Sequence, residues 1–483
     1  MFGTACERAV QIRNGAANWV AFTIAVCGVL FLLPFVWKLG EKPAVLLGAG
    51  IAIAVGPIAI WLLASFTKLI PYLLISAVYL SLFGLKLETG RLNVRPNVIL
   101  ALIGACVVGW QLFVGRSRPR RLPFVGLLIL VDVVYLLSTL RNPHNEFFWR
   151  GIFDCILFLA NVLQYALIVW FLAVDHEIFD RVVRFSLYAA TIYAGMNVFF
   201  FTLGELGMER MLDQFAGETG DFVRVSNLGT TEGTYIAFNV VVMFALLLIP
   251  NESRSISRKR LIFMLAINFA ALLLTFARGP WLAVAITIVV LVVLLMISLP
   301  IRKAAATMGK VFALLALLVA LGMGVLINSP ALSGMIVDRF AAFSALEAGT
   351  VSDRMLLWAN MWEDWKGSPW LGQGAHAYAK FRNDPSQISE NFLLEFLHST
   401  GVVGFTFFCF ILGCIILRGR RLLPNGDSLS RSTFGLPILA GFVAMCLSSL
   451  TNPGMTGGFF WVGMAFVVCA QELNPSMNTF PAR

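Results

Sequence analysis

The sequence contains few charged residues for its length. Only 13% of its 483 residues are Asp, Glu, Lys or Arg, whereas 59% are hydrophobic. Soluble globular domains are about one quarter charged and about half apolar, so this composition cannot cover a folded chain with a polar surface. Many apolar runs are also long enough to cross the roughly 30 Å of hydrocarbon in a bilayer. The sequence therefore excludes a soluble globular protein and predicts an integral membrane protein.

Three further patterns are missing, and each absence excludes a class of protein. The apolar runs do not alternate in polarity with a period of two, which argues against the strands of a membrane β-barrel. The eight cysteines show neither zinc-ligand spacing nor the pairing that is typical of a disulfide framework. The net charge of +10 is not gathered into a basic domain, so we expect no nucleic-acid partner.

The apolar runs predict an all-α fold, a polytopic transmembrane helical bundle with about 12–14 spans. The first run follows Arg8 and Arg13 as a signal peptide would, but it has no small-residue cleavage site, so we interpret it as a spanning helix. The predicted spans are residues 19–37, 44–64, 69–87, 98–114, 122–140, 152–173, 184–203, 233–250, 261–277, 280–299, 310–327, 392–417, 433–450 and 455–472.

Clusters of arginine and lysine between the spans predict the topology. The dense clusters are residues 115–121, 253–260, 300–303 and 418–421. An even number of spans separates each cluster from the next, so all four lie on one side, which is the cytoplasm by the positive-inside rule. The modestly basic loop 86–96 falls on the opposite side, but the four dense clusters outweigh it in this assignment. Both termini are then predicted to be cytoplasmic.

Two long non-apolar stretches fall on the other side, which would be the periplasm of a bacterial inner membrane. They are residues 204–232 and 328–391. A loop as long as the second one is usually functional in a compact protein. The predicted organisation is therefore a membrane region over 1–327, a large and partly helical periplasmic loop over 328–391, and C-terminal membrane helices over 392–483.

Arg278 interrupts an apolar run, "LLLTFARGPWLAV", that contains no acidic residue. The topology places it at the periplasmic end of a helix, where we expect Gly279 and Pro280 to make the turn into the next helix. An arginine at such a boundary often contacts lipid headgroups. The alternative is diphosphate binding, because a guanidinium group holds phosphate oxygens in a fork and stays charged. Arg224 lies just before another span and fits the same role.

The large loop contains an arginine of the same kind. Arg354 lies in "VSDRMLLWANMWEDW", where Ser352 or Asp353 is expected to cap an amphipathic helix. Trp358, Trp362 and Trp365 have helical spacing there. Either Arg354 binds diphosphate, or it forms a surface ion pair with Asp353 or Glu363.

The segment "SENFLLEFLHSTGVVGF" (389–405) returns the chain to the membrane. Ser389 or Glu390 is expected to begin the helix. A carboxylate at Glu390 is favoured there by the helix dipole alone, and it would also suit a general base. His398 lies two turns further on the same face, and we interpret it as a packed, neutral residue.

Three motifs resemble those of the superfamily of O-antigen ligases and Wzy-type polysaccharide polymerases. They are "LLLTFARGPWLAV", "RMLLWANMWEDWKGSPWLGQGAHAY" and "ENFLLEFLHSTGVVGF", and they follow in the family's order over roughly residues 220–405. The resemblance implies an inverting, GT-C-like glycosyltransferase that needs neither metal nor cofactor. Its donor would be an oligosaccharide linked to undecaprenyl diphosphate.

The resemblance also implies roles for particular residues. Arg224 and Arg278 fall where the family holds the donor diphosphate. Glu390 stands where ligases carry a histidine before Asn391, and Glu-Asn resembles the polymerase branch, so we expect Glu390 to be the base of a polymerase. His376 and His398 are alternatives for the base, and Asn391 and Trp358 are secondary site residues. The expected partners are the lipid-linked glycan, the bilayer and a chain-length regulator.

Other activities compete with polymerisation. An O-antigen ligase that acts on lipid A core, or a ligase that glycosylates protein, would belong to the same superfamily. A flippase or transporter would need an ionisable group inside the membrane, and Asp132 is the candidate. No internal repeat supports a transporter, and Asp132 is equally compatible with a contact to Asn161 or Gln164.

Overall fold

The computed structural model describes most of the chain between residues 67 and 474. The described residues are 67–82, 87–89, 92–94, 96–113, 120, 122–205, 230–248, 256–275, 277–298, several positions within 306–320, 349–381, 391–422, 434–451 and 457–474. They belong to two units, Met1–Leu122 and Pro123–Arg483, which are treated separately.

The first unit contains two apolar helices joined by a short hairpin. The helix α3 (Ile70–Leu82) follows a single 3-10 turn, η1 (Thr67–Leu69), and packs against α4 (Pro96–Phe113). Proline is favoured at the first position of a helix because its missing N–H would have no partner there. The strands β1 (Leu87–Thr89) and β2 (Leu92–Val94) pair antiparallel, with Leu87 opposite Val94.

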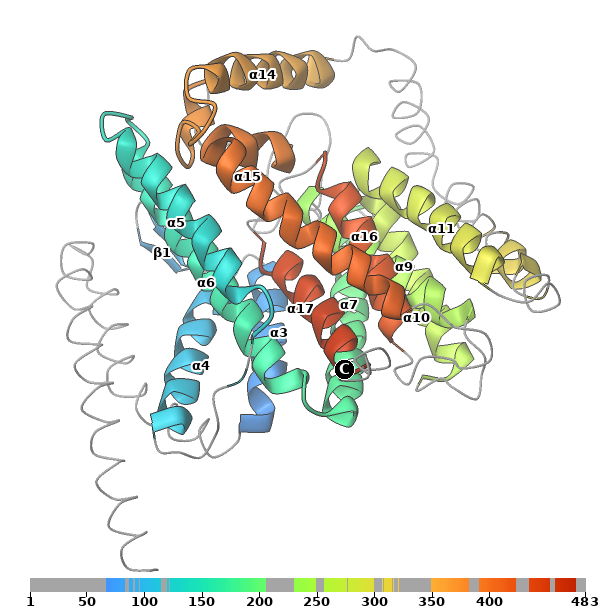
Figure 1. The fold of residues 1–483 in the computed structure, drawn as a ribbon. Helices are drawn as coiled ribbons and strands as arrows, with labels where there is room; N and C mark the ends of the chain where they lie inside the picture. The colour runs from blue at the N-terminus through green and yellow to red at the C-terminus, as the bar shows by residue number, and fades with distance from the viewer. Residues whose placement is uncertain are drawn as a thin grey trace, which may run out of the picture. The chain divides into compact units, whose positions relative to one another are not determined.

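The second unit is helical in every described element, which confirms the predicted all-α fold (Figure 1). Each predicted span that falls in the described residues is a helix, with ends that shift by up to eight positions. Spans 19–37 and 44–64 lie outside the described residues, and 310–327 lies largely outside them. The helices are α5 (Val125–Arg141), α6 (Phe148–Leu172), α7 (His176–Glu205), α9 (Thr230–Leu248), α10 (Arg258–Leu274), α11 (Arg278–Ser298), α14 (Gly349–Lys366), η3 (Ala377–Phe381), α15 (Phe392–Arg418), η4 (Gly419–Leu422), α16 (Gly435–Ser448) and α17 (Gly458–Glu472).

Apolar side chains cover both the inside and much of the outside of this unit. The helices α6, α11 and α15 are long and apolar enough to cross a membrane, and α9, α16 and α17 are shorter apolar helices. One side of α5 exposes Ile129, Val133, Leu136, Leu137 and Leu140. Such a continuous apolar surface is costly in water and suits contact with lipid. The chain is a multi-pass membrane protein.

The helix α9 forms the centre of the second unit. Its side chains from Thr234 to Leu248 are all buried, as expected for a helix that is apolar on every side. It packs against α10, α11 and α16. A Cβ atom at Gly441 of α16 would lie 2.5 Å from Cγ2 of Val242, so only glycine allows α16 to approach α9 this closely.

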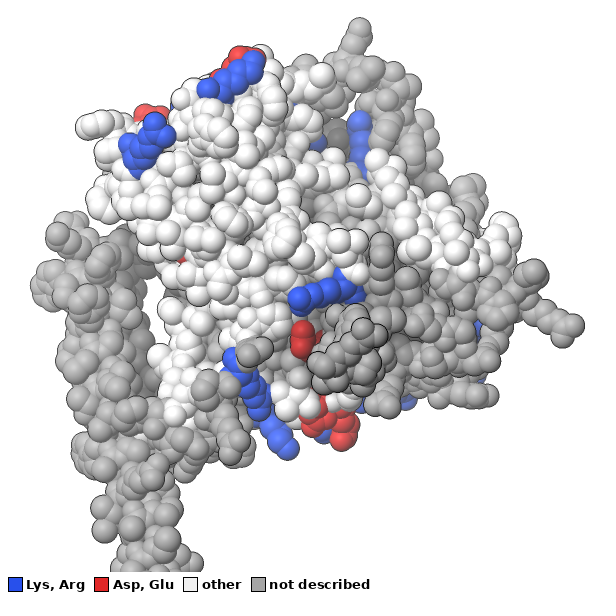
Figure 2. Space-filling model, in the orientation of Figure 1, with Lys and Arg blue, Asp and Glu red and all other residues white. Residues whose placement is uncertain are grey.

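The helix ends gather at two opposite ends of the unit. At one end, the hydroxyl of Tyr165 donates to the carbonyl of Pro123, and the amide of Gln471 donates to the carbonyl of Ile415. The other end carries α14, which lies across the start of α15 in Figure 1; we call it the α14 end. In Figure 2, charged side chains gather over α14 and again toward the opposite end, and the surface between them is largely uncharged.

Candidate active site

Arg278 is the first residue of α11, at the α14 end, and it is partly buried. The prediction that Gly279 and Pro280 form the turn was wrong. The preceding helix ends at Leu274, and Thr275 shapes the joint, because its hydroxyl donates to Leu272 and accepts from the N–H of Ala277. Arg278 therefore lies where the first N–H groups of a helix favour an anion.

The start of α9 lies against this joint. A Cβ atom at Gly233 would be 3.0 Å from Cγ of Pro280 and 3.5 Å from the side chain of Thr275. The next residue, Thr234, shares a 2.7 Å hydrogen bond with Ser448 at the end of α16. Arg224 itself lies outside the described residues.

The start of α15 lies beside the same end of α16. The N–H of Phe392 donates to the carbonyl of Ser449 at 3.3 Å. The N-cap is Asn391, whose side chain accepts from the N–H of Leu394 at 3.0 Å, so the expectation that the helix begins at Ser389 or Glu390 was wrong. Glu390 lies outside the described residues, one position before this cap. Contacts through α16 thus connect the start of α15 to the start of α9 and to the Arg278 joint.

The helix α15 is broken at Gly401, which has a φ of 64°. The loop 367–376 replaces the main-chain hydrogen bonds that the break removes. The N–H groups of Gln373 and Gly374 donate to the carbonyls of His398 and Ser399, at 2.8 and 3.1 Å. Beyond the break, Val402 and Val403 donate to the carbonyls of Pro369 and Trp370, at 2.8 and 3.2 Å. Irregular backbone in an apolar helix is tolerated where other protein groups satisfy it in this way.

Glycines on both sides make this approach possible. Gly372 has a φ of 75°, and a Cβ atom there would lie 2.6 Å from the carbonyl oxygen of His398 and from the nitrogen of Gly401. A Cβ atom at Gly401 would lie 2.3 Å from the carbonyl of Trp370. The turn Pro369–Gly374 and the step Gly401–Gly404 therefore interlock, and Gly372 and Gly401 are required by main-chain contact.

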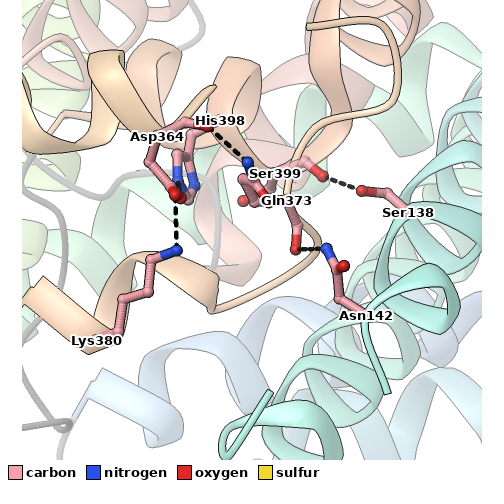
Figure 3. Close-up of polar contacts among 7 residues, drawn as sticks. All are labelled: Ser138, Asn142, Asp364, Gln373, Lys380, His398 and Ser399. Carbon is pink, nitrogen blue, oxygen red and sulfur yellow. Dashed lines mark hydrogen bonds and ion pairs between the residues drawn. The ribbon is translucent and has the colours of Figure 1, made fainter. Parts of the chain in front are cut away.

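The end of α5 holds the same loop from another side (Figure 3). The Ser138 hydroxyl donates to the carbonyl of Ser399 at 2.7 Å, and the Asn142 amide donates to the carbonyl of Gln373 at 2.8 Å. The hydroxyl of Thr139 accepts from the N–H of Ala375 at 2.9 Å. These three residues at the end of α5 were not identified in the sequence analysis, although polar residues at the end of an apolar helix could have indicated a contact site.

His398 is completely buried and points toward Asp364 at the end of α14 (Figure 3). Its Nε2 lies 2.8 Å from Oδ2 of Asp364, and Nζ of Lys380 lies 2.7 Å from Oδ1. Burial raises the pKa of the Asp364 carboxyl, but the hydrogen bonds with His398 and Lys380 lower it by more, so the pKa lies below its ordinary value of 3.8. Because an ionised carboxylate only accepts, Nε2 of His398 donates.

His376 is also paired with a carboxylate. Its Nδ1 lies 3.2 Å from Oδ2 of Asp154 near the start of α6, and its ring packs against Phe147 and Tyr378. Its φ of 59° is unusual for a residue other than glycine. Both alternative bases therefore lie inside the protein and contact carboxylates.

Arg278, Asp364, the loop 367–376 and the break at Gly401 lie within the part of the chain that matches a known family. Residues 261–409, from α10 to the middle of α15, match the model Wzy_C, described as O-antigen ligase. Residues 261–409 are thus similar to the O-antigen ligase family. The resemblance predicted from the three motifs is confirmed over this range. A search of curated proteins found no match to the chain.

The chain is thus a membrane protein of the glycan-processing O-antigen ligase and polymerase type. Within the matched residues, α14 begins at Gly349, so Ser352 and Asp353 lie inside the helix and the prediction that one of them caps it was wrong. Trp358 packs against a buried cluster of Leu357, Met361 and Tyr378.

The other predicted residues of α14 lie nearby. Arg354 is partly buried near the start of the helix. Glu363, which we considered as its partner, forms an exposed 2.7 Å ion pair with Lys366. In the described residues, His, Cys, Asp and Glu form no group of three that could hold a metal ion.

The interlocked turn predicts that Gly372 tolerates no side chain. We expect Gly372→Ala to lower the thermal unfolding temperature of the purified protein and to reduce its transfer activity, because the Cβ clashes with main-chain atoms and the φ is positive. The loss of stability should be about 1–3 kcal/mol. Gly413→Ala is the control, since nothing lies within 4 Å of a Cβ at Gly413. Equal unfolding temperatures for the two variants would contradict this interpretation.

Proposed function

We propose that this protein is a polysaccharide polymerase of the bacterial inner membrane. It transfers a glycan from undecaprenyl diphosphate to a sugar hydroxyl of a second lipid-linked repeat unit. The observation that carries the proposal is the sequence Glu390–Asn391 before α15, within the residues that match the O-antigen ligase family. A glutamate at this position, where ligases carry a histidine, favours the polymerase branch. The start of α15 contacts the end of α16, which also contacts the start of α9 beside the Arg278 joint.

The donor diphosphate is bound by arginines. Arg278 combines a guanidinium group with the N-terminus of α11, and both favour phosphate oxygens. Arg224, which precedes α9, and Arg354 on α14 complete the set of cations. Stabilising the charge of the departing diphosphate is the main electrostatic task of such a transfer.

Glu390 acts as the general base. The acceptor hydroxyl oxygen attacks the anomeric carbon of the donor glycan from the side opposite the phosphate, and the bond from that carbon to the phosphate oxygen breaks. The hydroxyl proton passes to Glu390, and the electron pair of the broken bond stays on the diphosphate. The configuration at the anomeric carbon inverts, and the step requires neither metal nor cofactor.

The α14 end faces the periplasm in this proposal. Arg258 at the start of α10 and Arg418 at the end of α15 belong to the basic clusters, which favour the cytoplasm. Arg278 follows the far end of α10, and Asn391 caps the start of α15, so both lie away from these clusters. Residues 1–327 and 392–483 then form the membrane region, with 204–232 and 328–391 on the periplasmic side and both termini in the cytoplasm. A chain-length regulator would act as a separate protein.

A deletion strain distinguishes polymerisation from ligation. Ligation is the activity that the description of the matched family names. Without the protein, single lipid-linked repeat units should accumulate in the membrane, as measured by mass spectrometry of extracted lipid-linked glycans. Accumulation of long lipid-linked polymer would instead identify a ligase for lipid A core or for protein. Repeat units confined to the cytoplasmic leaflet would identify a flippase.

Substitution of Arg278 tests the diphosphate site. Arg278→Ala should reduce transfer by about 100-fold or more, because one preorganised charge contact at a leaving group has that weight. Arg278→Lys should also be weak, since an ammonium group lacks the fork. The measurement is transfer by purified protein in lipid, with unfolding temperature as the control for folding. An active Arg278→Ala variant would exclude the arginine from diphosphate binding.

Glu390→Gln tests the base. The amide keeps the size of the side chain but cannot take the acceptor proton, so the transfer rate at saturating donor should fall by about 100-fold or more. His376→Gln serves as the comparison, because His376 contacts Asp154 and should affect folding more than chemistry. Full activity of Glu390→Gln would move the role of base to another residue.

A further inference from the structure

The first part of α15 is a separate short helix. The break at Gly401 leaves the stretch Phe392–Thr400 without continuous helical hydrogen bonds to the membrane part that follows. Its direction therefore depends on the groups that hold it from outside. The loop 367–376 holds its last main-chain carbonyls, and Asp364 holds the side chain of His398.

Asp364 joins this short helix to the rest of the large loop. Its two carboxylate oxygens contact His398 of α15 and Lys380 of η3. Its main-chain carbonyl accepts from Nε2 of Gln373 at 2.6 Å. We call Asp364, His398 and Lys380 the Asp364 clasp. Figure 3 shows that the carboxylate lies between the imidazole of His398 and the ammonium of Lys380.

The contact between Asp364 and His398 is buried, so its loss should cost more stability than the loss of an exposed ion pair. The side chain of His398 is 0% exposed and that of Asp364 is 20% exposed. Removing one partner would leave a buried polar group unsatisfied, which costs more than an exposed ion pair contributes. The neighbouring Glu363–Lys366 pair has the same 2.7 Å distance as the Asp364–Lys380 pair, but its side chains are 68% and 52% exposed.

The clasp lies between Arg354 of α14 and the start of the short helix. Arg354 precedes Asp364 on α14 by ten positions, which is about 15 Å along a helix. Asn391, the cap of the short helix, precedes His398 by seven positions, which is about 10 Å along a helix. A change in the angle between α14 and the short helix would therefore move Arg354 relative to the start of this helix, which follows Glu390 and Asn391 in the sequence.

We propose that Asp364 is a positioning residue for glycan transfer: its contact with His398 sets the angle between α14 and the first part of α15. The inference rests on the proposed roles of Arg354 and Glu390. It assigns Asp364 no contact with substrate. Displacement of reacting groups by about 1 Å from a remote change can cost 100-fold in rate, so the effect of losing the clasp should appear in the chemical step.

Asp364→Asn is the test, with Glu363→Gln as the matched control on the same helix. The first readout is hydrogen exchange of the amides in Phe392–Thr400, measured by mass spectrometry on the full chain in lipid nanodiscs. We expect Asp364→Asn to speed this exchange at least tenfold, whereas Glu363→Gln leaves it unchanged. Unchanged exchange in Asp364→Asn would overturn the inference, whatever reaction the protein catalyses.

The second readout separates positioning from folding. With lipid-linked donor, Asp364→Asn should lower kcat by about tenfold to 100-fold while the donor KM stays within twofold and most of the unfolding temperature is retained. Asp364→Glu, which keeps the charge, should recover part of kcat. Loss of kcat only in proportion to loss of folded protein, in both variants, would overturn the inference and leave a structural role.

These results are distinguishable from failure of the proposed function. If Glu390→Gln keeps full activity while Asp364→Asn is slow with faster amide exchange, the base is wrong and the clasp still positions the short helix. If Glu390→Gln is inactive and Asp364→Asn is as fast as the natural protein, the proposed function stands and the clasp inference fails.

Discussion

The architecture of the α14 end depends on one constraint, which is that the backbone broken at Gly401 must find hydrogen-bond partners inside an apolar environment. Residues 398–401 are buried, and an unsatisfied amide or carbonyl there would cost several kcal/mol. The loop 367–376 supplies them with its own main chain, from Pro369 to Gly374. The loop is in turn held by α5 and by the first turns of α6.

This constraint gives the motif residues two different kinds of role. The glycines and the proline of the turn serve main-chain contact, and the histidines serve contacts with Asp154 and Asp364. Arg278, in contrast, begins a helix whose N-terminus favours an anion. A rigid scaffold that holds such groups at one end of a helical unit suits a site that must position its reactants closely.

Local patterns predicted the helices well and the contacts poorly. Apolar length identified α6, α11 and α15 because hydrophobic runs of that size have few alternatives. The start of α11 was displaced from Pro280 to Arg278 because the side chain of Thr275 stabilises an earlier turn, and propensity alone does not reveal this. The contacts of α5 were not predictable, since Ser138 and its partner Ser399 are 261 positions apart.

The sequence by itself determined that the chain is an all-α membrane protein with the motifs of the O-antigen ligase family. Composition, apolar length and motif order are properties of the chain that need no partner in space. Only the tertiary structure decided that the two glycine motifs interlock, that His376 and His398 face carboxylates, and that α16 connects Arg278 to the start of α15. These facts depend on pairs of residues distant in sequence, which are brought together by the packing of helices around α9.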